Sequence, residues 1–87
     1  MEHNLGERIK WRRELLKKTQ EDIAKAVGCT AVYISMIETG RRLPEDDVLD
    51  KIADALCMRV LILLRMKYAQ DKKVHSKIKE ILAKEDS

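Results

Sequence analysis

The chain has 87 residues, which limits it to one domain with a modest hydrophobic core. Hydrophobic residues make up 45% of it, which excludes wholesale disorder, and aromatic residues only 3%, which favours helices over strands. The net charge of +3 is a mild preference for polyanions, and two cysteines without a CxxC pair exclude a zinc site and a disulfide framework. We therefore expect a soluble, cytoplasmic, all-α protein with no metal and no cofactor.

The first helix is predicted from Leu5 to about Leu16, because Leu5, Ile9 and Leu16 can share one face. Asn4 is a suitable N-cap, with Glu7 as its capping-box partner. The segment is also strongly basic, and its cations are Arg8, Lys10, Arg12, Arg13, Lys17 and Lys18.

Two short amphipathic helices joined by a tight turn are predicted between Thr19 and Gly40. Thr19 and Thr30 are suitable N-caps for these helices, with Asp22 completing a capping box after Thr19. Gly28 lies between them, where a positive φ is needed. Their apolar stripe consists of Ile23, Ala24, Val27, Ile34 and Ile37.

A fourth helix is predicted after the loop 40–44, with Pro44 at its first position and acidic residues in its first turn. These acids are Glu45, Asp46 and Asp47. The apolar face of this helix is formed by Val48, Leu49, Ile52, Ala53 and Leu56. The acidic helix and the basic N-terminal segment suit a protein with one face toward DNA and another away from it.

The segment 59–70 is predicted to be a fifth helix, although its apolar run 60–64 is also compatible with a short strand. A helix that is apolar on nearly every side leaves surface that a dimer interface would cover. A last helix is predicted at about 71–84. The candidate interface residues are Val60, Leu61, Leu64, Ile78 and Ile81.

Residues 5–64 resemble the lambda repressor and Cro type of helix-turn-helix regulator. The resemblance is carried by Gln20, the Ala24–Gly28 pair, the two isoleucines of the second motif helix, and the run 37–41. It implies a five-helix lambda-repressor-like DNA-binding domain over 1–70, with 71–87 as a C-terminal helical tail in the same compact unit or as a dimerisation element. Arg12 and Lys18 depart from the family pattern, because apolar residues are common at both positions.

The resemblance also implies site residues. The recognition helix, at about 30–39, would enter the major groove of double-stranded DNA. The base-reading positions match Thr30, Ala31, Val32, Ser35 and Met36, of which Val32 and Met36 have core packing as an alternative. The DNA-backbone positions match Gln20, Tyr33, Thr39, Arg41, Arg42 and Lys18. Arg13 and Glu38 match positions that commonly form a buried ion pair.

The sequence therefore predicts a small homodimeric transcriptional regulator or repressor from a bacterium or phage, bound to a palindromic operator. Nothing in the sequence indicates an enzyme. Two alternatives stay open. The chain could be the antitoxin of a toxin–antitoxin pair, with the tail holding a toxin, or a protein-interaction adaptor that does not bind DNA. Because Ala31 and Val32 offer only methyl groups, we expect the recognised positions to be rich in thymine.

Overall fold

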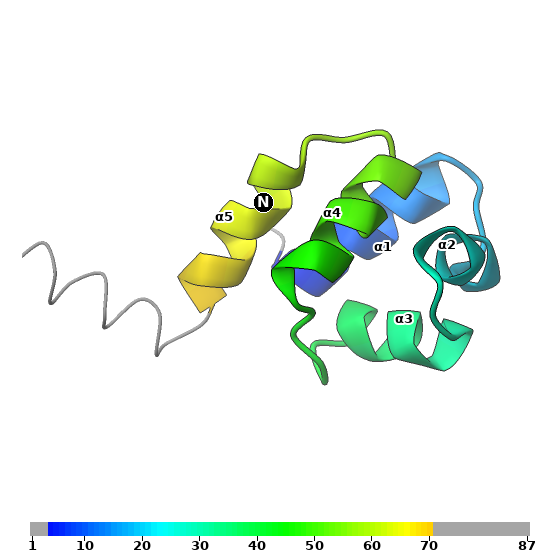
Figure 1. Cartoon of the computed structure of the whole chain (residues 1–87), viewed down its shortest axis with the longest axis horizontal. Coiled ribbons are helices and arrows are strands. Elements are labelled where there is room, and N and C mark those ends of the chain that lie inside the picture. The colour runs from blue at the N-terminus through cyan, green and yellow to red at the C-terminus, as the bar shows by residue number, and fades with distance from the viewer. Residues whose placement is uncertain (1–3, 71–87) are drawn as a thin grey trace, which may run out of the picture.

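The structure is a computed structural model that describes residues 4–70, and within this range it contains five helices and no strand. The helices are α1 (Leu5–Leu15), α2 (Gln20–Val27), α3 (Ala31–Glu38), α4 (Asp46–Ala55) and α5 (Val60–Gln70) (Figure 1). The predicted all-α class is confirmed, and the strand alternative at 60–64 is wrong. The predicted helix at 71–84 lies outside the described residues.

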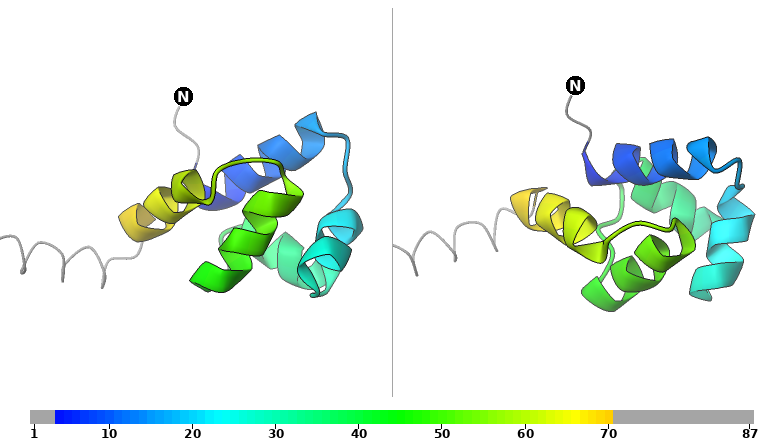
Figure 2. Two further views of the ribbon diagram at one scale, coloured as in Figure 1. Left: turned by 45° about the horizontal axis from the view of Figure 1, so that its top comes forward. Right: turned by 90° about the horizontal axis from the view of Figure 1, so that it is seen from above.

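The core lies between α1, α2, α3 and α4, with α5 on the opposite side of the bundle from α2 (Figures 1 and 2). The helices α1 to α4 contribute most of the apolar faces that their periodicity indicated, with Leu16 and Val48 only partly buried, and α5 contributes Leu63. The buried core consists of Leu5, Ile9, Ile23, Ala24, Val27, Ile34, Ile37, Leu49, Ile52, Ala53, Leu56 and Leu63.

Local sequence signals account for where most of the helices begin. The Asn4 side chain accepts the Glu7 backbone N–H at 2.9 Å, and Thr19 and Asp22 form a complete capping box at α2. Gly28 ends α2 in the left-handed region at φ 89°. The prediction for Pro44 was wrong, because α4 begins at Asp46 and is preceded by an extended N-cap, Glu45.

Close approach of α1 to α3 depends on Gly6, whose role the sequence pattern did not reveal. A Cβ atom at this position would lie 2.5 Å from the Glu38 carbonyl oxygen and 2.8 Å from its carbonyl carbon. These neighbours are backbone atoms and cannot rotate away as a side chain does. Gly6 therefore sets how near the N-terminal half of α1 lies to the end of α3.

Arg12 and Lys18, the two residues that depart from the pattern of the family this sequence resembles, both contact the C-terminus of α4. Arg12 Nε donates to the Leu56 carbonyl at 2.9 Å and its Nη2 to the Cys57 carbonyl at 3.2 Å. Lys18 Nζ donates to the Ala55 carbonyl at 3.0 Å. The last turn of α4 has no basic residue of its own, so these cations occupy the negative end of its dipole.

The last residues of α5 make hydrogen bonds to the rest of the fold. Lys67 Nζ donates to Asp46 Oδ1 at 2.7 Å, and the Tyr68 hydroxyl donates to the other carboxylate oxygen of Asp46. These hydrogen bonds, that of Lys67 first, lower the pKa of the Asp46 carboxyl. At the last residue of α5, Gln70 Oε1 accepts the Leu5 backbone N–H at 2.6 Å. The side chains of α5 thus contact the starts of α1 and α4.

Candidate nucleic-acid interface

The helix α3 is divided between a buried face and an outward face. Ile34 and Ile37 are fully buried, whereas Val32 is 69% exposed. Among the other predicted base-reading positions, Thr30 is exposed and Ala31, Ser35 and Met36 are half-buried. The core alternative is therefore wrong for Val32, whose isopropyl group points to solvent.

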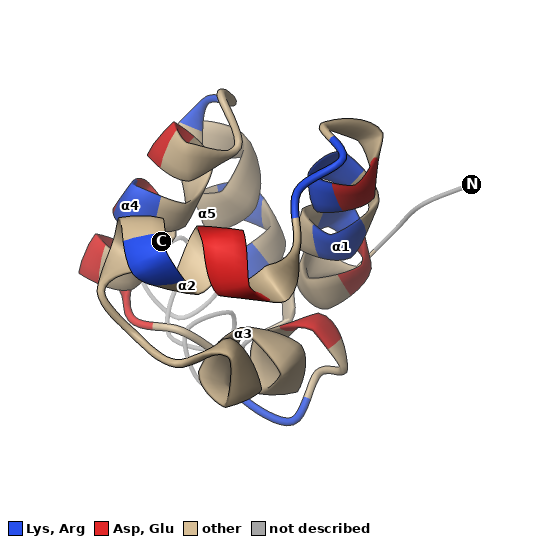
Figure 3. Cartoon of the chain, turned by 90° about the vertical axis from the view of Figure 1, so that its right-hand side faces the viewer, with Lys and Arg blue, Asp and Glu red and all other residues tan. Residues whose placement is uncertain are grey.

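The outward face of α3 has no positive charge of its own. Its sequence from Ala31 to Glu38 contains a single charged residue, Glu38, and Figure 3 shows the helix without Lys or Arg next to a basic loop. That loop contains Arg41 and Arg42, which are both exposed. The arrangement places an uncharged helix surface beside two cations, which suits reading of base edges beside binding of phosphates.

The C-terminal end of α3 is built so that the loop cations lie close to it. The backbone N–H groups of Arg41 and Arg42 both donate to the Met36 carbonyl, at 2.9 and 3.2 Å. The Arg42 guanidinium lies over the Tyr33 ring, 5.9 Å from its centroid. Thr39 Oγ1 donates to the Ser35 carbonyl at 3.0 Å, so its hydroxyl caps the helix end.

Two further predicted DNA-contacting residues make contacts inside the protein. Lys18 Nζ donates to the Ala55 carbonyl at the end of α4, and its place among the phosphate-contacting residues stays a prediction. Gln20 is the first residue of α2, and its Nε2 donates to Glu38 Oε1 at 3.1 Å. The amide nitrogen of Gln20 carries a second hydrogen, which leaves this residue able to donate to a phosphate.

The ion pair implied by the resemblance is present. Arg13 Nε donates to Glu38 Oε2 at 2.7 Å, and Arg13 Nη2 donates to Glu38 Oε1 at 3.0 Å. The two side chains are 12% and 2% exposed, so the pair is almost fully enclosed. The hydrogen bonding to Glu38 raises the pKa of Arg13. The pair joins α1 to the end of α3.

The predicted interface residues of α5 differ in exposure. Leu61 is 57% exposed and its neighbour Ile62 is 38% exposed, while Val60 and Leu64 are half-buried against the core. Ile78 and Ile81 lie outside the part of the chain that the structure describes. The described portion of α5 thus presents a small apolar surface of two adjacent residues.

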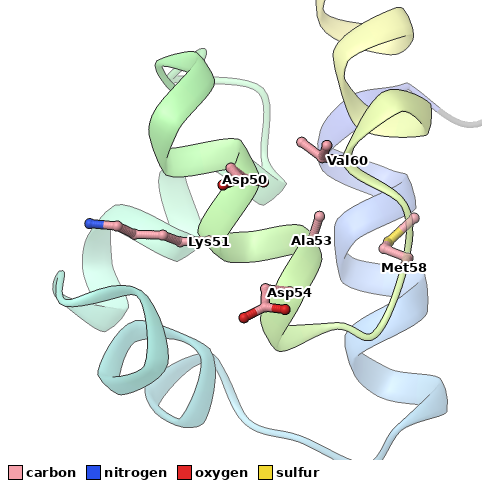
Figure 4. A pocket seen from close by; sticks show the side chains of 6 residues that line it. All are labelled: Asp50, Lys51, Ala53, Asp54, Met58 and Val60. Atoms are coloured by element: carbon pink, nitrogen blue, oxygen red, sulfur yellow. The ribbon is translucent and has the colours of Figure 1, made fainter.

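An open pocket of about 330 Å³ lies where α4 meets the start of α5 (Figure 4). Its lining residues are Asp50, Lys51, Ala53, Asp54, Met58 and Val60. None of them belongs to α2 or α3, so the pocket is separate from the outward face of α3. Within residues 4–70 no His, Cys, Asp and Glu side chains gather as a metal site, and no helix is long and apolar enough to cross a membrane.

Three comparisons with known proteins agree with this geometry. The helix-turn-helix family model matches residues 9–56, from α1 to the end of α4. The uncharacterized HTH-type transcriptional regulator YazB of Bacillus subtilis (strain 168) is 41% identical over 51 residues, which cover 59% of this chain and 74% of YazB. The P22 c2 repressor, solved in complex with a synthetic operator, has 34% sequence identity and a TM-score of 0.68. That alignment covers 71% of this chain and 94% of the repressor chain.

Proposed function

Because the chain belongs to the Cro/C1-type helix-turn-helix family of DNA-binding transcriptional regulators, we propose that it is a repressor that binds a specific double-stranded operator. The observation that carries this proposal is the outward, uncharged face of α3 beside two exposed arginines. In proteins of this architecture the second helix of the motif lies in the major groove, while the first crosses the backbone. The segment 30–39 would then read the bases.

The chemistry of α3 favours reading of thymine methyl groups. Ala31 and Val32 have no hydrogen-bonding side-chain atoms, so they cannot form the bidentate contacts that distinguish guanine or adenine. The exposed Val32 can pack its methyl groups against the thymine C5-methyl, and Met36 can reach the same surface one turn along. Thr30 and Ser35 each offer a single hydroxyl. At each position, the free-energy difference between the preferred base and a wrong base should be smaller than the roughly 1–3 kcal/mol that a bidentate pair provides.

Much of the affinity should come from phosphates. Arg41 and Arg42 can neutralise phosphate charge beside the C-terminal end of α3, and Gln20 can donate at the N-terminus of α2. Contacts by cations release condensed counterions, so affinity should fall steeply as the salt concentration rises.

We also propose a homodimer formed through the exposed apolar surface of α5. Leu61 and Ile62 are the large exposed apolar residues of this helix, and they lie on a different element from the DNA-facing residues. Two-fold DNA readers bind half-sites about 34–36 Å apart, so the interface would set this spacing and the operator would be palindromic. Sedimentation should show a dimer at micromolar concentration. A monomer at high micromolar concentration, with and without operator, would refute this part of the proposal.

The experiment that tests the function begins with selection of bound fragments from random DNA. Replacing thymine by uracil at the recognised positions removes only the C5-methyl group, so weaker binding isolates the methyl contact. Val32→Ala should relax preference at the same positions. Leu15→Ala is the matched control, because Leu15 is 55% exposed on α1, outside the motif, and should leave preference unchanged.

Two outcomes would overturn these proposals. If no fragment is enriched, the chain is not a sequence-specific DNA binder and a protein-interaction role becomes the better hypothesis. If fragments are enriched, yet neither uracil nor Val32→Ala changes the preference, the protein reads its operator by another means than methyl contacts.

A further inference from the structure

The Glu38 carboxylate is a buried junction that joins α3 to α1 and to the start of α2. Its Oε1 accepts from both Arg13 Nη2 and Gln20 Nε2, and its Oε2 accepts from Arg13 Nε. The side chain is only 2% exposed. One group at the end of the recognition helix therefore holds the first side chain of α2.

Arg13 holds the main chain at the same place. Its Nη1 donates to the Lys18 carbonyl at 2.9 Å, two residues before Gln20. The backbone that enters α2 and the side chain that opens α2 are thus both fixed by the Arg13–Glu38 pair. Since α1 supplies Arg13 and α3 supplies Glu38, the N-terminus of α2 has a defined position relative to the recognition helix.

The charge of Glu38 also determines which way the Gln20 amide faces. A carboxylate accepts hydrogen bonds and repels a carbonyl oxygen, so Nε2 must lie toward Glu38. Because one N–H of the amide is directed at Glu38, the other hydrogen has a fixed direction instead of rotating freely. A donor with a fixed orientation loses less entropy on binding than a mobile one.

We infer that Arg13 and Glu38 are positioning residues for DNA binding, which act by orienting the Gln20 amide so that its second N–H donates to an operator phosphate. This inference rests on the proposed function. It assigns the buried pair a role besides folding. Replacing a buried ion pair by apolar side chains is often neutral or stabilising, because the desolvation of both charges is avoided.

The test separates stability from DNA affinity with the full-length chain and a selected operator fragment. The double variant Arg13→Met with Glu38→Leu should melt at the wild-type temperature or above, yet bind the operator about tenfold more weakly, as expected for one lost hydrogen bond to a charged group. Gln20→Met should weaken wild-type binding by a similar factor. In the double-variant background it should cause no further loss.

A salt titration and a matched control sharpen the test. Gln20 is uncharged, so Gln20→Met should leave the dependence of affinity on salt unchanged, whereas Arg42→Ala should reduce its slope by about 1. Lys67→Met is the matched control: it removes the ion pair with Asp46, which joins α4 to α5, and should leave operator affinity unchanged.

The outcomes distinguish the inference from the proposed function. Equal losses from Gln20→Met in both backgrounds, or full operator affinity in the double variant, would overturn the positioning role alone. Failure of the wild-type chain to bind any selected fragment would overturn the proposed function, and this inference with it. If the double variant does not fold, side-chain amide NMR of the wild type decides. The Gln20 amide protons should shift when operator is added, and unchanged resonances would overturn the inference.

Discussion

Substitution of Gly6 by alanine should destabilise the fold through a steric clash between α1 and α3. The added Cβ would lie 2.5 Å from the Glu38 carbonyl oxygen, and real Cβ contacts are not observed below 3.0 Å. The two helices would have to separate by at least half an ångström at this point. Overpacking of this kind costs about 3 kcal/mol at the upper end of its usual range.

Alanine also has a higher helix propensity than glycine, by about 1 kcal/mol in a helix interior, which is the most it can return at the second residue of α1. The net expectation for Gly6→Ala is a loss of about 2 kcal/mol in the free energy of unfolding. For a domain of this size that loss should lower the melting temperature by about 10 °C. Urea unfolding and thermal melting followed by circular dichroism at 222 nm would measure both quantities.

Gly28→Ala is the matched control for this experiment. Gly28 has φ 89° and no atom within 4 Å of an added Cβ, so alanine there is penalised by backbone conformation and not by contact. Both variants should be less stable, but only Gly6→Ala should change the NMR chemical shifts of the residues near Ile37. A Gly6→Ala variant as stable as the wild type, or more so, would refute the steric argument.

Three further predictions concern other positions. Lys17 has a left-handed backbone at φ 56°, which glycine adopts more readily, so Lys17→Gly should raise the free energy of unfolding by about 1 kcal/mol. Lys10→Gly is the control inside α1 and should lower the free energy of unfolding by a similar amount; urea unfolding measures both. Arg12→Ala removes two hydrogen bonds to the end of α4 and should cost about 1–3 kcal/mol in thermal unfolding; no loss would mean that these bonds do not stabilise α4. The pKa of Asp46 is lowered in the folded state, so its contribution is present above its unfolded pKa and is lost as pH falls through the folded one. Asp46→Asn should therefore be less stable than wild type at neutral pH, and the difference should shrink below about pH 4; a difference independent of pH would contradict this reasoning.

The motif from Thr19 to Gly40 could be predicted because its signals are local. Threonine N-caps, a glycine in the left-handed region and apolar residues at helical spacing each act within one or two helical turns. The outward position of Val32 also followed, since Ile34 and Ile37 already filled the inner face. The Arg13–Glu38 pair did not follow from local signals and was indicated by the family resemblance.

The contacts that the sequence did not reveal join residues far apart in the chain. Arg12 and Leu56 are separated by 44 residues, and Lys18 and Ala55 by 37. No pattern within a helix indicates which distant carbonyl a cation will meet. For the same reason the contact of Lys18 with the end of α4 was not predicted. The backbone approach at Gly6 is likewise a property of two packed helices and not of either one.

The division of α3 into an inner and an outer face separates the requirements of folding from those of sequence preference. The helix is held by Ile34 and Ile37 on its inner face, by Thr30 at its start and by Glu38 at its end. Val32 lies mostly in solvent and takes no part in the core. A substitution there leaves the core intact, so under the proposed function a change at this position would alter which DNA sequence is preferred while the fold is kept. Folding and sequence preference could then change independently of one another.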